Sequence, residues 1–97
     1  MLNSRQRAAL RKLAATQQPI FQIGKNGISD ETVKQIDAAL EARELIKLHV
    51  LETADLTPRE VCDALCNATG ADGVQVIGSK CVLYRRSEKH PRIELPC

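Results

Sequence analysis

Apolar residues recur along the chain with two spacings, and the change from one spacing to the other separates helices from strands. Segments in which apolar residues recur every three to four positions predict helices, and short runs of branched apolar residues predict strands. The predicted helices span residues 4 to about 15, 29 to about 43 and 57 to 69. The predicted strands span residues 19–23, 45–51, 74–77 and 81–85.

Residues at the ends of these segments support the helix boundaries. Ser4 and Ser29 are suitable N-caps for the first two helices. The third helix has the clearest start, because Thr57 precedes Pro58 and because Glu60 completes a capping box. The positions expected to face the core are Leu2, Ala9, Leu10 and Leu13 on the first helix, Val33, Ile36 and Leu40 on the second, and Val61, Ala64, Leu65 and Ala68 on the third.

The resulting order, α-β-α-β-α-β-β, predicts an α/β fold. Strands that alternate with helices imply crossover connections between parallel neighbours. A turn at residues 78–80 adds an antiparallel hairpin at the end. We therefore expect a mixed four-stranded sheet with packed helices, formed by one domain over residues 1–97, in which residues 87–97 are an extended charged tail.

Composition restricts the class of protein. An apolar share of 43% is typical of a folded domain, and no apolar run approaches the roughly 20 residues that span a bilayer. The first residues lack the apolar core of a secretion signal. We therefore expect a cytoplasmic protein whose four cysteines are reduced thiols.

Charge is distributed unevenly, although the formal net charge is only +2. Residues 1–25 contain five cations and no acid, and residues 80–92 contain five cations and one acid. Residues 26–79 contain four cations and ten acids. Such a chain can fold into a particle with one face that attracts a polyanion.

A glycine-bracketed loop, Gly24-Lys25-Asn26-Gly27, lies between the first strand and the second helix. Glycines permit positive φ and close backbone approach, a helix N-terminus attracts anions, and lysine adds a mobile cation. The loop has neither the P-loop spacing nor the dinucleotide fingerprint. A G-x-x-G loop of this length is typical of contacts to a nucleic-acid backbone. An ordinary strand-to-helix turn is the alternative.

Further candidate contacts lie in the basic ends and in the second long strand. The basic residues of the first helix could instead be solvated. The arginine pair at the end of the last strand could instead protect a sheet edge. On the second helix, Asp30, Asp37, Glu41 and Glu44 form an acidic stripe that we expect to face water. The predicted RNA-contacting residues are Gly24, Lys25, Asn26, Gly27, Arg5, Arg7, Arg11, Lys12, Lys47, Arg85 and Arg86.

Catalytic and metal sites have little support. Cys62 and Cys66 share a helix, but no C-x-x-C pair is present and the two histidines are scattered, so we predict buried thiols and no metal or cofactor. No nucleophile and base stand at a recognisable spacing, which predicts a protein that is not an enzyme. Only Phe21 and Tyr84 are aromatic, which favours recognition of RNA shape and backbone over base stacking.

Several motifs together resemble a known family. They are residues 23–28, 44–48, 73–78 and 82–85. In this order they resemble the CRM (chloroplast RNA splicing and ribosome maturation) domain in its stand-alone bacterial, YhbY-like form, over roughly residues 2–95. The resemblance implies a fold similar to the C-terminal domain of translation initiation factor 3. It also implies binding to ribosomal RNA in large-subunit precursors through the glycine loop and adjoining basic surface.

Two other functions remain open from the residues. The chain could be a protein-interaction module that docks on a ribosomal protein without contacting RNA. It could also be an enzyme that uses the glycine loop as an anion site for a small phosphate ligand. The leading expectation is an RNA-binding factor for ribosome assembly that has no membrane or small-molecule partner.

Overall fold

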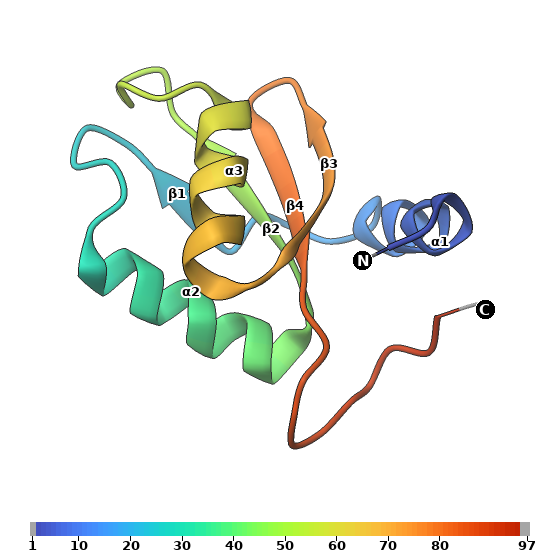
Figure 1. The fold of residues 1–97 in the computed structure, drawn as a ribbon. Coiled ribbons are helices and arrows are strands. Elements are labelled where there is room, and N and C mark those ends of the chain that lie inside the picture. Colours follow the sequence, from blue (N-terminus) through green and yellow to red (C-terminus); the bar gives the residue numbers. More distant parts are fainter. Residues whose placement is uncertain (1, 96–97) are drawn as a thin grey trace.

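The structure is a computed structural model, and it describes residues 2–95. Helices and strands follow each other in the predicted order (Figure 1). The helices are α1 (Ser4–Ala14), α2 (Asp30–Arg43) and α3 (Pro58–Thr69). The strands are β1 (Phe21–Ile23), β2 (Leu45–Val50), β3 (Asp72–Ile77) and β4 (Lys80–Tyr84). The predicted α/β fold class is therefore confirmed, with strand limits that shift by up to two residues.

The four strands form one mixed sheet in the order β1-β2-β4-β3. β1 pairs in parallel with β2, whereas β4 is antiparallel to both of its neighbours. β4 therefore lies between β2 and β3, the two strands that the α3 crossover connects. This insertion leaves β1 and β3 as the edge strands.

The helix starts confirm two predicted caps, Ser29 and Thr57, and show one error. The capping box of α3 is present, with the Thr57 hydroxyl accepting from the Glu60 N–H at 3.2 Å and the Glu60 carboxylate accepting from the Thr57 N–H at 2.9 Å. Ser4 is not the cap of α1. Asn3 caps it instead, because its side-chain oxygen accepts from the N–H of Gln6 at 2.8 Å.

Each face of the sheet has its own apolar core. α2 and α3 cover one face, and α1 together with residues 93 and 95 of the C-terminal segment packs on the other (Figure 1). β2 and β4 contribute alternate residues to the two cores. Within residues 2–95, no helix is long and apolar enough to cross a membrane.

The buried face of α3 differs from the prediction. Cys62 and Thr69 are buried, whereas Ala64 and Ala68 are exposed. Cys62 is close to β3, where a Cβ added at Gly73 would lie 3.0 Å from the cysteine sulfur. On α1 the predicted core residue Leu13 is 47% exposed. The predicted core positions of α2 are confirmed, since Ile36 and Leu40 lie in the core and Val33 is partly buried against it.

Two residues of the acidic stripe, Glu41 and Glu44, hold the C-terminal segment, so the expectation that the stripe faces water is wrong for these two. Glu44 has no solvent-exposed surface, and its carboxylate accepts from the backbone N–H groups of Ser87, Arg92 and Ile93. Glu41 accepts from the Ser87 hydroxyl and from the N–H groups of residues 88 and 89. The segment from residue 87 lacks regular structure, but side chains of α2 hold its backbone.

The backbone and electrostatics at Glu44 reflect this role. Glu44 follows the last residue of α2 with a φ of +67°, and a positive φ is uncommon for a residue with a side chain. Burial acts to raise the pKa of Glu44, but the three N–H donors and the nearby Arg86 outweigh it and lower the pKa below its ordinary value. The carboxylate is therefore stabilised in its charged form.

Candidate nucleic-acid interface

The glycine loop forms a tight turn directly after β1. The Gly27 N–H donates to the Gly24 carbonyl at 2.9 Å, and Gly27 has a φ of +63°, which favours glycine. Lys25 and Asn26 are exposed at the tip of the turn. Within residues 2–95, no hydrogen bond engages the backbone N–H of Lys25 or Asn26. Two N–H groups and one ammonium group are therefore available to an anion.

Gly24 has a different role from Gly27. Its backbone is not in the left-handed region, and a Cβ placed there would lie 3.3 Å from the Leu51 side chain and 3.4 Å from the Thr53 hydroxyl. The turn also lies beside the segment after β2, since the Leu51 N–H donates to the Ile23 carbonyl. A side chain at position 24 would therefore press against residues 51 and 53, and glycine lets the loop pack closely there.

The surroundings of the loop contain both signs of charge. Ser29 caps α2 through the Thr32 N–H, which occupies one donor of the helix start. Exposed carboxylates lie in the first turn of α2 and in the segment that follows β2. These carboxylates belong to Asp30, Glu31, Glu52 and Asp55. The helix start therefore offers less positive potential than the sequence pattern alone indicates.

The cations of α1 form a second group. Arg5, Arg11 and Lys12 are exposed and take part in no ion pair among the described residues. Arg7 is half-buried, and its Nε is buried without a hydrogen-bond partner within residues 2–95. It lines a hollow of about 490 Å³ between α3 and β3. Three of the four predicted α1 residues are therefore free to meet a polyanion.

The structure does not bring the glycine loop and α1 together. α1 packs on Leu45 and Tyr84, which pair at the beginning of β2, whereas the loop lies beyond the paired Ile23 and Val50 at the other end of the sheet. In Figure 1 the loop and α1 accordingly lie on opposite sides of the molecule. The predicted residues therefore form two separate groups of cations.

Lys47 lies between these groups. It is half-buried on β2, and its ammonium donates to the Gln17 carbonyl at 3.1 Å. That hydrogen bond ties the segment between α1 and β1 to the sheet. Because an ammonium has three donors, Lys47 keeps capacity for a further acceptor.

Arg85 and Arg86 differ sharply. Arg85 forms an ion pair with Asp37 and donates to the carbonyls of Thr69 at 2.8 Å and Asp37 at 3.0 Å, so its guanidinium joins the end of α3 to α2. Arg86 is exposed. Arg85 therefore has a structural role, and Arg86 is the member of the pair that can reach a ligand.

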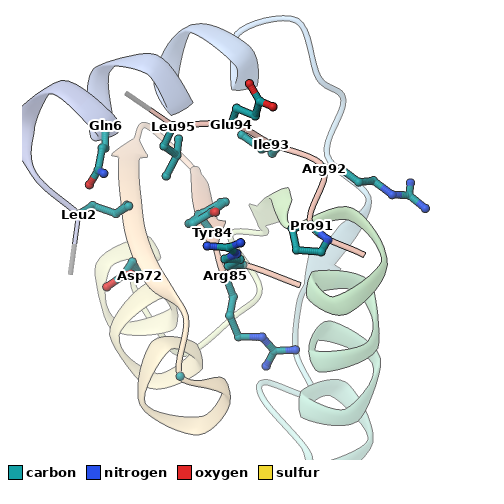
Figure 2. A pocket seen from close by; sticks show the side chains of 12 residues that line it. Leu2, Gln6, Asp72, Tyr84, Arg85, Pro91, Arg92, Ile93, Glu94 and Leu95 are labelled. Carbon is teal, nitrogen blue, oxygen red and sulfur yellow. The ribbon is translucent and has the colours of Figure 1, made fainter. Parts of the chain in front are cut away.

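A hollow of about 870 Å³ lies between α1, the C-terminal segment and the ends of β3 and β4. Figure 2 shows Leu2, Tyr84 and Leu95 pointing toward one another in it, while the Arg92 side chain points away. Asp72 and Glu94 also contribute to its lining. The hollow therefore combines apolar, acidic and basic groups and provides no continuous positive surface.

The described cysteines are free thiols. Cys62 and Cys66 share one face of α3, and burial raises the pKa of Cys81 to about 12. Within the described part of the chain, no three side chains of His, Cys, Asp or Glu are grouped as metal ligands. Cys97 lies outside the described residues.

The sequence did not identify His49 and Lys80 as neighbours on one face of the sheet. The two residues are 31 positions apart, and they become neighbours because β2 and β4 pair with His49 opposite Lys80. The alternation of apolar residues in β2 indicates that Lys47 and His49 share a face. Only the strand order shows which residue of β4 stands beside them.

A small mixed α/β domain with exposed cations on one sheet face and on an adjoining helix is typical of proteins that bind polyanions. Comparison with known families identifies the family to which the chain is related. The family model of the CRS1 / YhbY (CRM) domain matches residues 2–85. The chain belongs to this family.

Individual relatives agree with this assignment. The chain is 45% identical to the Bacillus subtilis protein named "Probable RNA-binding protein YqeI", over 99% of this chain and all of that protein. It is 36% identical to a Haemophilus influenzae protein named "RNA-binding protein", over 98% of this chain and 95% of that protein. The solution structure of SAV1595 from Staphylococcus aureus, titled as a candidate RNA-binding protein, superposes with a TM-score of 0.82. Its sequence is 50% identical, with 99% of this chain and all of that chain covered. These names describe RNA-binding proteins and not a class of enzyme.

Proposed function

We propose that this protein binds RNA through phosphate contacts and that its partner is ribosomal RNA in precursors of the large ribosomal subunit. The chain would act as a single CRM-like unit in the cytoplasm and assist ribosome assembly without catalysis. Membership of a family whose relatives are named as RNA-binding proteins supports the RNA partner. The glycine-loop region and the later strand motifs resemble the stand-alone bacterial CRM form. This resemblance supports ribosomal RNA as the particular partner.

The observation that carries the proposal is the set of exposed cations without ion-pair partners. Lys25 at the glycine loop, Arg5, Arg11 and Lys12 on α1, and Arg86 after β4 are exposed, and the described ion pairs involve none of them. Cations near phosphates release counterions on binding, which supplies sequence-independent affinity. Such contacts position an RNA backbone without reading its bases.

The glycine loop contributes a defined anion contact within this surface. The free N–H groups of Lys25 and Asn26 and the Lys25 ammonium can converge on one phosphate oxygen group. The nearby carboxylates of α2 and of residues 52–55 limit how much the glycine loop contributes to RNA affinity. The loop therefore acts together with the α1 cations and requires an RNA that extends across the protein, whose longest dimension is 39 Å.

A protein-interaction module that docks on a ribosomal protein is the second candidate, because the exposed cations would also suit an acidic protein. The two functions differ in their need for RNA. The decisive experiment measures binding of the purified protein to protein-free large-subunit ribosomal RNA by fluorescence anisotropy. We expect saturable binding. If the protein binds precursor particles after nuclease treatment but not protein-free RNA, docking on a protein is the correct function.

A further inference from the structure

The strand register places four side chains in one row across the sheet. Gln22 pairs with His49, His49 with Lys80, and Lys80 with Ile77, so one residue of each strand contributes. Directly paired residues point to the same face of a sheet. The adjacent residues Ile23, Leu48, Val50 and Cys81 are buried in the core under α2 and α3. The row, which we call the open row, therefore lies on the face that carries α1.

α1 leaves the open row uncovered. The side chains of that face that pack under α1 are Leu45, Val74, Val82 and Tyr84, toward the other end of β2. Gln22 and Lys80 are exposed, His49 is half-buried, and Ile77 is 58% exposed. This half of the sheet face is accessible and lies between α1 and the end of the sheet at which the glycine loop begins.

The charged side chains of the open row and of the row beside it are lysines. The open row contains Lys80 and no acid, and the adjacent row contributes Lys47 opposite Val82. The neighbour of Lys47 on the β1 side is Ile20, which directly precedes β1 and whose N–H donates to the Lys47 carbonyl. Two cations and no carboxylate on an accessible face favour an anionic partner.

A hollow at the β1 edge adds a second kind of contact. It measures about 490 Å³ and is lined by residues 19–22 and by His49. Phe21 contributes to this lining, but its side chain packs against the core under α2 and α3. The His49 ring and the neighbouring apolar residue Ile20, beside the Gln22 amide, suit a flat heteroaromatic base. A base can enter this hollow only where it is unpaired.

We propose that a single-stranded stretch of RNA lies across the open row, with phosphates at Lys80 and Lys47 and one base in the hollow beside His49. This inference rests on the proposed RNA-binding function and adds a distinct element to it. The track also connects the glycine loop with the α1 cations, which the structure otherwise separates. It predicts a preference for RNA with an unpaired segment over uniform duplex RNA.

The test compares a 12-nucleotide oligouridylate with an abasic ribose-phosphate oligomer of equal length and charge, both measured by fluorescence anisotropy. Lys80→Gln should weaken binding of both oligomers by about 3- to 5-fold, as expected for loss of one phosphate contact. His49→Ala should weaken the oligouridylate by about 5- to 10-fold, as stacking contacts do, and leave the abasic oligomer unchanged. Lys34→Gln removes an exposed cation from α2, away from the row, and is the matched control.

The outcomes separate this inference from the proposed function. If wild-type protein binds ribosomal RNA but the Lys80 and His49 variants match Lys34→Gln on both oligomers, the RNA track is wrong and the proposed function stands. If the wild-type protein binds no RNA at all, the proposed function fails with it. His49→Gln keeps a polar planar group and replaces His49→Ala if circular dichroism shows that the alanine variant is unfolded.

Discussion

Replacing Glu44 by glutamine removes the charge that holds the C-terminal segment and should destabilise the fold. The carboxylate accepts three backbone N–H groups, at 2.5, 2.8 and 2.9 Å. Hydrogen bonds to a charged group contribute about 1.5–3 kcal/mol each, which sets an upper limit of roughly 4.5–9 kcal/mol for three. Glutamine keeps one accepting oxygen, and released N–H groups can bind water. We therefore expect a loss of about 2–3 kcal/mol in the free energy of unfolding.

This loss is measurable by thermal unfolding followed by circular dichroism at pH 7. For a domain of this size, about 2–3 kcal/mol corresponds to a fall in Tm of roughly 8–24 °C. Glu88→Gln changes an exposed carboxylate in the same segment and should leave Tm almost unchanged. Equal Tm values for the Glu44→Gln and Glu88→Gln variants would refute the role assigned to the carboxylate.

The pH dependence supplies an independent check with a defined sign. Because the pKa of Glu44 is lowered in the folded protein, Glu44 contributes fully to the free energy of unfolding at pH values above its ordinary pKa of 4.5. It is lost as the pH falls through the lower folded-state value. The difference in stability between wild type and Glu44→Gln should therefore be largest at neutral pH and shrink in acid. A constant difference down to the acid-unfolded state would contradict the assignment.

Two further substitutions separate structural cations from RNA-binding cations. Lys25→Ala should lower affinity for RNA of any sequence by about 3- to 10-fold without changing Tm, because the side chain is exposed; unchanged affinity in a titration at low salt would exclude the loop lysine. Arg85→Ala should lower the free energy of unfolding by about 2 kcal/mol, because it breaks the ion pair with Asp37 and two carbonyl contacts. Arg85→Ala should leave the RNA affinity of the folded protein unchanged, whereas the control, Arg86→Ala, should lower RNA affinity and leave stability unchanged. Loss of RNA affinity in Arg85→Ala and loss of stability in Arg86→Ala would contradict the roles of the two arginines.

The order of helices and strands could be predicted from the sequence because apolar spacing and capping residues are local signals. Thr57 and Glu60 show this most clearly, since both halves of their capping box are present. The position of β4 between β2 and β3 could not be predicted, because no local pattern encodes which strands pair. The same limitation concealed the proximity of His49 and Lys80.

The interpretation of the acidic stripe failed for a related reason. A helical row of carboxylates such as Asp37, Glu41 and Glu44 is usually solvated, and the donors that meet it here are mostly backbone N–H groups of the C-terminal segment. Backbone donors leave no mark in the side-chain pattern. The ion pair of Arg85 could not be predicted either, because its partner, Asp37, lies 48 positions away in the sequence. Long-range pairing therefore explains why neither set of contacts could be predicted from the sequence.

The most direct test of the account is the salt dependence of affinity for protein-free ribosomal RNA. If four to six exposed cations meet phosphates, log K should fall linearly with log salt concentration with a slope between about −3 and −5. Lys25→Ala should reduce the magnitude of that slope by roughly one. An affinity that stays flat from low to moderate salt would contradict binding through the phosphate backbone.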